Sequence, residues 1–214
     1  MDIRRKVCSS VCRKIKEIHG LQPTDILSTY LNNTVSFVDM SRVLSKMEIP
    51  CIKTDFSELQ KNLNLSAGDA IWGMAATRGD DLIIAYSKNL SFSMYNYVLA
   101  HELGHCCLHL PISAEFHVEL KTGNDVYSDS SLIQNRPSLI RKQRSSQKFF
   151  MKESEADYFA MQLLMPNDLI EKYKSCNFQL TTQDLSKYFK VPIPLAQKKI
   201  DFIKESVATD KLHE

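Results

Sequence analysis

The chain has 214 residues, with 27 Lys and Arg against 25 Asp and Glu and a formal net charge of +2. Hydrophobic residues at 43% and charged residues at 24% are ordinary for a globular protein, which excludes a fibrous or largely disordered chain. The near-neutral charge gives no overall preference for nucleic acid or membrane surfaces. No apolar run approaches the roughly 20 residues of a membrane-spanning helix, and no secretory signal is recognisable. We therefore expect a cytoplasmic protein.

The cysteines are also consistent with a cytoplasmic location. The chain is too long for a small disulfide-stapled domain and lacks a signal, so we expect six reduced thiols. No second Cys/His pair completes a structural zinc site. The six are Cys8, Cys12, Cys51, Cys106, Cys107 and Cys176.

The first predicted elements in chain order are helices. An amphipathic, basic helix is predicted over residues 1–18, ended by Gly20. Two more helices are predicted over Thr24–Leu31 and Val38–Met47, before Pro50.

Short strands follow these helices. One is predicted over residues 49–53, and two more over Gly68–Thr77 and Asp81–Tyr86. The turn that begins at Arg78 joins the last two strands into a hairpin. These strands predict a small mixed sheet.

Residues 112–150 separate two strongly helical segments, Ser93–Leu110 and Lys152–Met165. They are polar and weakly periodic, so we interpret them as an insertion loop. The part from 128 to 150 carries five basic residues against the single acid Asp129. It is a candidate for partner contact, the alternative being a solvated loop with no role.

The C-terminal part is helical. Helices are predicted over Asn167–Lys174 and, as a pair joined by a proline-containing turn, within Thr181–Ser206. The fold class is therefore α+β. We divide the chain into an N-terminal helical segment (1–37), a core (38–175) and a helix-turn-helix-like region (176–214).

The central motif is His101-Glu102-Leu103-Gly104-His105, an HExxH pattern. Positions i and i+4 lie on one face of a helix, so both imidazoles can bind one metal ion while Glu102 projects toward a metal-bound water. Two surface histidines are the alternative interpretation. The apolar flank Val98-Leu99-Ala100 predicts a buried helix instead, and buried histidines need partners.

A catalytic zinc site needs a third protein ligand. The His-extended pattern HExxHxxGxxH fails, because position 108 is Leu and position 111 is Pro. Glu115 and Glu119 are close in sequence but belong to the polar segment.

A glutamate on the later helix is the better candidate. Glu153 begins this helix, and Asp157 lies one turn further along the same face. Glu153 can then bind the metal while Asp157 accepts a hydrogen bond from a ligand histidine. Glu155 is expected on the opposite side of the helix. We therefore predict one Zn²⁺ per chain, bound by His101, His105 and Glu153.

Three stretches together resemble a known family. They are Asp81–Tyr86 followed by Val98-Leu99-Ala100, the HExxH motif with Leu108-His109, and Glu153–Ala160 followed by Leu163-Leu164-Met165-Pro166. The chain resembles the ImmA/IrrE family of metallopeptidases from roughly Val38 to Ile203. The resemblance implies a zincin-like core with a glutamate as third ligand. It also implies cleavage of a helix-turn-helix (XRE-type) repressor, which derepresses phage, mobile-element or stress-response genes.

Two features depart from the family pattern. The spacing between His105 and Glu153 is longer than usual, so residues 112–150 are expected to alter or gate substrate access. Asp157 stands where family members often carry Asn, and both side chains can accept a hydrogen bond.

The expected chemistry is zinc-dependent peptide hydrolysis. The ion would polarise a water and the scissile carbonyl, and Glu102 would move the water's proton to the leaving amine. The peptide is expected along the edge of the Asp81–Tyr86 strand. Sequence does not choose among five candidate oxyanion stabilisers. They are Tyr95, Tyr97, His109, His117 and Tyr127.

The C-terminal pair offers a competing interpretation. Lys198, Lys199 and Lys204 on its second helix are candidates for phosphate contact, although Pro192 and Pro194 crowd the turn. The alternative function is a non-catalytic regulator or antitoxin-like module that binds DNA or protein with a structural or vestigial metal site. Retention of Glu102 favours the peptidase, because a structural site has no use for it.

Overall fold

We analysed a computed structural model of the chain. It describes residues 16–31, 37–62, 70–78, 81–109, 116–122, 147–176 and 180–210. Within these ranges the chain combines a small mixed sheet with many helices, so the predicted α+β class is confirmed. Most of the first predicted helix and most of the predicted basic loop lie outside the described residues.

The sheet has four strands in the described residues, in the order β1-β3-β2-β4. The predicted hairpin is present, since β2 and β3 pair antiparallel, whereas β1 and β3 pair parallel. Because β3 pairs on both sides, the expectation that a peptide adds to its edge is wrong. The strands are β1 (Cys51–Thr54), β2 (Ile71–Arg78), β3 (Asp81–Ser87) and β4 (Phe116–Thr122).

Strand β4 lies inside the segment predicted as an insertion loop. It pairs antiparallel with β2, so this part of residues 112–150 belongs to the sheet. Alternation of Phe116, Val118 and Leu120 with polar residues is the period-2 signal of a strand, which the polar character of the whole segment hid. The Glu-bearing helix α8 (Gln147–Leu164) also begins earlier than predicted.

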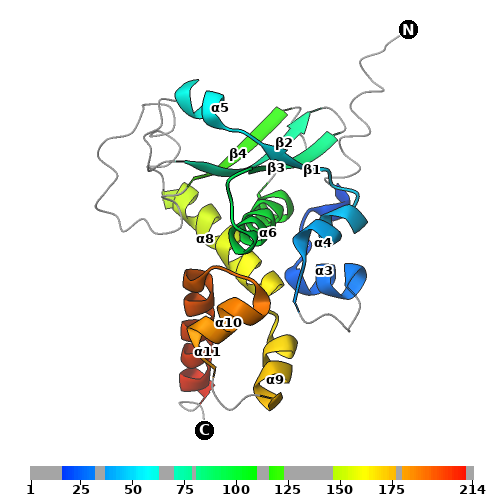
Figure 1. The fold of residues 1–214 in the computed structure, drawn as a ribbon. Coiled ribbons are helices and arrows are strands. Elements are labelled where there is room, and N and C mark those ends of the chain that lie inside the picture. Colours follow the sequence, from blue (N-terminus) through cyan, green and yellow to red (C-terminus); the bar gives the residue numbers. More distant parts are fainter. Residues whose placement is uncertain are drawn as a thin grey trace.

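Helix α6 (Phe92–Leu108) is the central helix and lies against the sheet (Figure 1). The side chain of Ser91 caps its first turn by accepting a hydrogen bond from the Met94 N–H. Every residue from Asn96 to Cys107 is buried, which explains why the helix is apolar around most of its circumference.

Helix α4 (Met40–Lys46) packs on α6 and helix α3 (Pro23–Tyr30) packs on α8 (Figure 1). The short α5 (Ser57–Asn62) was not predicted. Buried Asn96 joins α6 to the start of α4. Its Oδ1 accepts from the Met40 N–H at 2.9 Å and its Nδ2 donates to the Val38 carbonyl at 2.8 Å. These bonds satisfy backbone groups that a helix start leaves unpaired.

Helix α8 packs closely on α6. A Cβ added to Gly104 would lie 3.2 Å from the Ala156 Cα and 3.2 Å from the Phe159 Cβ, so a larger residue at 104 would force the helices apart. This close approach brings the first turns of α8 over the HExxH residues. Helix α9 (Asn167–Cys176) follows after Pro166.

The predicted C-terminal helix pair is present as α10 (Thr182–Phe189) and α11 (Ile193–Asp210). It packs at the end of the molecule away from the sheet (Figure 1). Thr181 caps α10, and Lys190 ends it with a left-handed backbone, φ 56°. The Thr182 hydroxyl donates to Gln197 Oε1 at 2.7 Å, which joins the two helices.

One hydrophobic core connects these helices to the sheet. Residues from the N-terminal helices, α6, α8 and the C-terminal pair all contribute to it, including Leu44, Tyr97, Phe159, Phe189 and Ala196. In the part of the chain that the structure describes, no helix has both the length and the apolar character needed to cross a membrane.

Candidate metal centre

Helix α6 places the three polar residues of the HExxH motif in the interior. His101 and Glu102 are 0% exposed and His105 is 2% exposed. The four-residue spacing places the two imidazoles on one face, where the rings meet edge to face and their Nε2 atoms lie 3.0 Å apart. Two ring nitrogens this close can bind the same metal ion.

Helix α8 adds a carboxylate at the same position. Glu153 Oε2 lies 3.3 Å from His101 Nε2, and Oε1 lies 3.1 Å from His105 Nε2. Tetrahedral zinc with bonds of about 2.0–2.1 Å separates its ligand atoms by about 3.3 Å. His101, His105 and Glu153 are buried together and can hold a metal ion, so the predicted ligand set fits one.

Glu102 lies between α6 and β2. A Cβ added to Gly73 on β2 would lie 2.8 Å from Glu102 Oε1 and 2.4 Å from Val98 Cγ1. Glycine at position 73 therefore leaves the room in which the Glu102 side chain lies. The acid is held beside the metal-binding residues by a strand as well as by its own helix.

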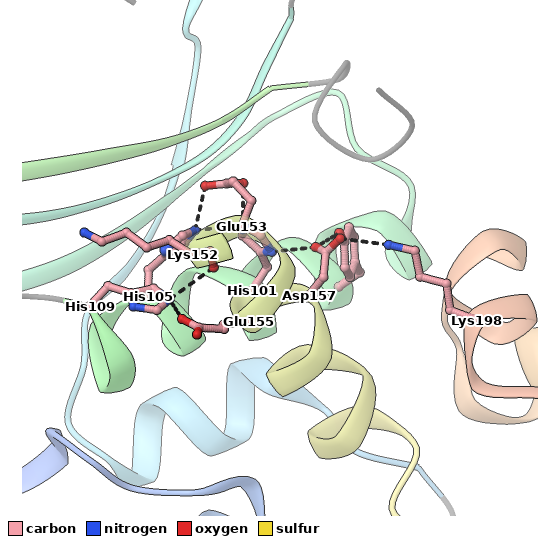
Figure 2. Close-up of polar contacts among 9 residues, drawn as sticks. His101, His105, His109, Lys152, Glu153, Glu155, Asp157 and Lys198 are labelled. Carbon is pink, nitrogen blue, oxygen red and sulfur yellow. Dashed lines mark hydrogen bonds and ion pairs between the residues drawn. The ribbon is translucent and has the colours of Figure 1, made fainter. Parts of the chain in front are cut away.

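Asp157 lies behind His101, one turn along α8 from Glu153. Its Oδ1 is 2.9 Å from His101 Nδ1 and also accepts the Tyr97 hydroxyl at 2.5 Å. If His101 Nδ1 carries the ring proton and donates it to this carboxylate, Nε2 is the nitrogen with the lone pair for a metal. Figure 2 shows Asp157 between His101 and Lys198, whose Nζ donates to Asp157 Oδ2 at 3.0 Å.

His109 continues the histidine face of α6 but lies outside the metal-binding group. Its Nε2 is 3.1 Å from the Lys152 carbonyl and 3.5 Å from Glu155 Oε2 (Figure 2). These contacts join the end of α6 to the start of α8. The Glu155 side chain is 54% exposed and pairs with His109 rather than with the metal-binding group.

Of the other candidate oxyanion stabilisers, Tyr97 reaches the site through Asp157, whereas Tyr95 makes its described ring contact elsewhere. Tyr95 packs on Tyr86 with ring centroids 4.6 Å apart, and burial raises its pKa to about 12. The Tyr97 hydroxyl is bonded to Asp157. His117 lies on β4 opposite Thr77, and Tyr127 lies outside the described residues.

The two alternative third ligands are also placed. Glu119 lies on β4 opposite Ala75 of β2, and Glu115 lies outside the described residues. Glu153 is the acid that joins the two histidines in the part of the chain that the structure describes.

The described thiols are not metal ligands. None of Cys51, Cys106 and Cys107 forms a disulfide bond. Burial raises the pKa of Cys107 to about 12, so it stays a thiol at neutral pH, and the thiolate is the form that binds metals. Both cysteines that follow His105 therefore act as core residues.

A pocket of about 1130 Å³ lies between α3 and α8. His109 and Glu155 line it, but none of the three metal-binding residues does. The pocket and the metal-binding group are therefore separate features on either side of the start of α8.

Two lysines of α11, which the sequence suggested for phosphate contact, form hydrogen bonds within the protein instead. Lys198 bonds Asp157, and Lys199 is 0% exposed and bonds Gln162 at 2.8 Å and Asn167 at 2.9 Å. Their place on an amphipathic helix carries no sign of these partners, because Asp157 is 41 residues away in sequence. Only the packing of α11 on α8 brings them together.

Comparisons of the chain with protein-family models, with curated proteins and with solved structures find no match. What the site does is therefore inferred from the geometry described above.

Proposed function

We propose that the chain is a zinc-dependent endopeptidase with a zincin-like core. The observation that carries this proposal is the buried group of His101, His105 and Glu153, whose ligand atoms all lie within 4.8 Å of one another, with Glu102 beside them on the same helix. Two imidazoles and one carboxylate are the donor set of hydrolytic zinc sites that keep a position for water.

Each residue has a separate role in this proposal. A zinc ion held by His101, His105 and Glu153 supplies Lewis-acid chemistry to a peptide carbonyl and a water. Glu102 accepts a proton from the water and delivers it to the leaving amine, as a general base and then a general acid. Asp157 fixes the ring orientation of His101 through its Nδ1.

The substrate is proposed to bind as an added strand on β4. Among the described strands, β1 and β4 each pair on one side only. Strand β4 pairs with β2, which carries Gly73 beside Glu102. An extended peptide on β4 therefore has a sheet edge for its backbone hydrogen bonds, about 10 Å (two strand spacings) from the strand that borders the proposed base.

The substrate class rests on the resemblance to ImmA/IrrE peptidases. That resemblance points to a helix-turn-helix repressor as the protein that is cut, inside the cytoplasm. A near-neutral net charge of +2 agrees with selection by docking of one protein partner, because it provides no strong long-range attraction.

The competing function is a non-catalytic regulator that binds DNA through α11. The folded chain leaves fewer lysines available for phosphate contact than the sequence suggests. Lys199 is fully buried and Lys198 is bonded to Asp157, so two of the three lysines proposed for phosphate contact are engaged within the protein. Lys204 alone of the three is exposed without such a described bond.

The test separates metal binding from catalysis. Wild-type protein and Glu102→Gln are loaded with zinc, and their metal content and their cleavage of a helix-turn-helix repressor are measured. The expected result is equal zinc content and a loss of cleavage of about 100-fold or more in the variant. Glu171→Gln on α9, an exposed acid, is the matched control and should cleave normally.

Two outcomes would contradict the proposal. One is a wild-type protein that binds no zinc. The other is equal cleavage by wild type and Glu102→Gln, since a general base cannot be replaced by an amide without loss.

A further inference from the structure

Lys198 reaches the metal centre from a helix that supplies no ligand to it. Its Nζ donates to Asp157 Oδ2 at 3.0 Å, while Oδ1 of the same carboxylate bonds His101 and Tyr97. The lysine therefore holds one oxygen of Asp157 while the other oxygen orients a ligand histidine.

The charges at the site give this contact its significance. Glu102, Glu153 and Asp157 are three buried acids close together, none more than 7% exposed. A divalent ion offsets two of these negative charges, and the Lys198 ammonium offsets the third. Burying an unbalanced charge is costly, so the lysine completes the charge balance of the loaded site.

The surroundings of the pair also fit a charged contact that solvent can reach. The Lys198 side chain is 50% exposed and that of Asp157 is 10% exposed. Both line a pocket of about 330 Å³ between α8 and α11. Lys198 therefore keeps one side in water, while the carboxylate that it holds lies in the interior.

We propose that Lys198 is a positioning residue that raises metal affinity by holding Asp157 against His101, which makes the C-terminal helices part of the metal centre. The proposal rests on the metal-binding part of the proposed function and not on peptide cleavage. It implies that movement of α11 away from α8 weakens metal binding without any change at the three ligands.

The experiment measures the dissociation constant for Zn²⁺ by competition with a chromophoric chelator. In Lys198→Met, the apolar stem is kept and the charge is lost. We expect affinity to fall about threefold to tenfold, less than the about 10- to 100-fold expected for loss of a group bonded directly to a ligand histidine. Lys198→Arg should restore affinity to within about twofold, because its charge can still reach a carboxylate.

Two further measurements separate positioning from a general effect on folding. Lys204→Met, which changes an exposed lysine on the same helix, should leave affinity unchanged. The visible absorption spectrum of bound Co²⁺ should change in Lys198→Met, because the orientation of a ligand changes, whereas urea unfolding of the metal-free protein should show that the variant is folded.

A double-mutant cycle tests the route through Asp157. In an Asp157→Asn background the carboxylate charge is absent, so Lys198→Met should change affinity by less than about twofold. An undiminished effect in that background would overturn the proposal, as would equal affinities of wild type and Lys198→Met. A wild-type protein that binds neither Zn²⁺ nor Co²⁺ would overturn the proposed function and this proposal together.

Discussion

Helix α8 borders two buried polar sites that differ in the sign of the charge they collect. Near its start, Glu153 and Asp157 join Glu102 and two histidines, so negative charge gathers around a position for a cation. Near its end, the ammonium of Lys199 is held by the neutral side chains of Gln162 and Asn167.

The difference shows how one helix surface serves two purposes. The first site can bind a cation and gains stability when one arrives. The second site already holds its cation, at 0% exposure, and offers it neutral oxygens and the ring of Phe202, 5.6 Å away. Burial lowers the pKa of Lys199 to about 8, which is the cost of enclosing a charge without an acid beside it.

The largest difference between the two sites is expected when a metal ligand is removed from the first site. Glu153→Ala should weaken zinc binding by more than about 100-fold, since losing a ligand exceeds the about 10- to 100-fold cost of losing an outer hydrogen-bond partner. Lys199→Met should leave zinc affinity unchanged. Metal content after dialysis measures both.

Glu119→Ala is the matched control for the ligand assignment. Glu119 lies on β4, opposite Ala75 of β2. If Glu119→Ala lost its zinc while Glu153→Ala kept it, the assignment of the third ligand would be wrong.

The second test uses pH to probe the enclosed cation. The folded-state pKa of Lys199 is about 8, below the ordinary value of 10.5, so the unfolded chain binds more protons between these values. The free energy of unfolding of wild type, relative to Lys199→Met, should therefore rise as pH increases from about 8 toward 10.5, by at most about 3 kcal/mol.

Urea unfolding at pH 7, 8, 9 and 10 measures this difference. Lys204→Met serves as the control, because its side chain is exposed to water. A difference between wild type and Lys199→Met that stays constant over this series would show that Lys199 is not destabilised by burial.

The third test addresses how the first site holds its base. In Gly73→Ala, the added Cβ would lie 2.8 Å from Glu102 Oε1, so the carboxylate must move. We expect cleavage to fall about tenfold or more, because small misplacements of catalytic groups are costly. Zinc affinity should change little.

Gly104→Ala should show the opposite pattern. Its added Cβ would press on Ala156 of α8, which carries Glu153 one turn earlier, so metal affinity should fall together with cleavage. Identical effects of the two glycine variants on zinc affinity would contradict the separate placement of base and ligand.

The smallest expected effect concerns the helix pair that supplies both lysines. Thr181 Oγ1 accepts the Asp184 N–H at 3.1 Å and caps α10. Thr181→Ala should lower the free energy of unfolding by about 1 kcal/mol, as loss of a helix cap does. Thermal unfolding checks the loss, and zinc affinity should stay within about twofold while α11 remains docked.

Much of the metal-binding group was predictable, because its spacing is local. His101 and His105 share a helix face by sequence separation alone, and Glu153 with Asp157 repeats that spacing on a second helix. Two strong helical patterns in the sequence were enough to predict the helix face that carries the two histidines and the face that carries Glu153 and Asp157. That the two helices meet depends on Gly104, whose role is evident only from the close contact with Ala156.

The rest depends on contacts that have no local pattern. The basic residues of α11 suggested a solvated or phosphate-binding face, yet Lys198 and Lys199 lie against α8. Strand β4 was missed because a polar setting outweighed its alternation. Strand β3 was taken as an edge, although the short strand predicted before it pairs with it in parallel as β1. Pairing across a sheet is set by tertiary packing, which short sequence windows do not contain.

The metal centre joins residues that lie far apart in the sequence, and this determines the order in which its contacts form during synthesis. The His101–Asp157 contact spans 56 residues and the Asp157–Lys198 contact spans 41. A ribosome delivers the histidines first, then the acids of α8, and Lys198 last. The metal centre is therefore among the last parts of the molecule to be completed during synthesis, because the Lys198 contact with Asp157 forms only after α11 has been made.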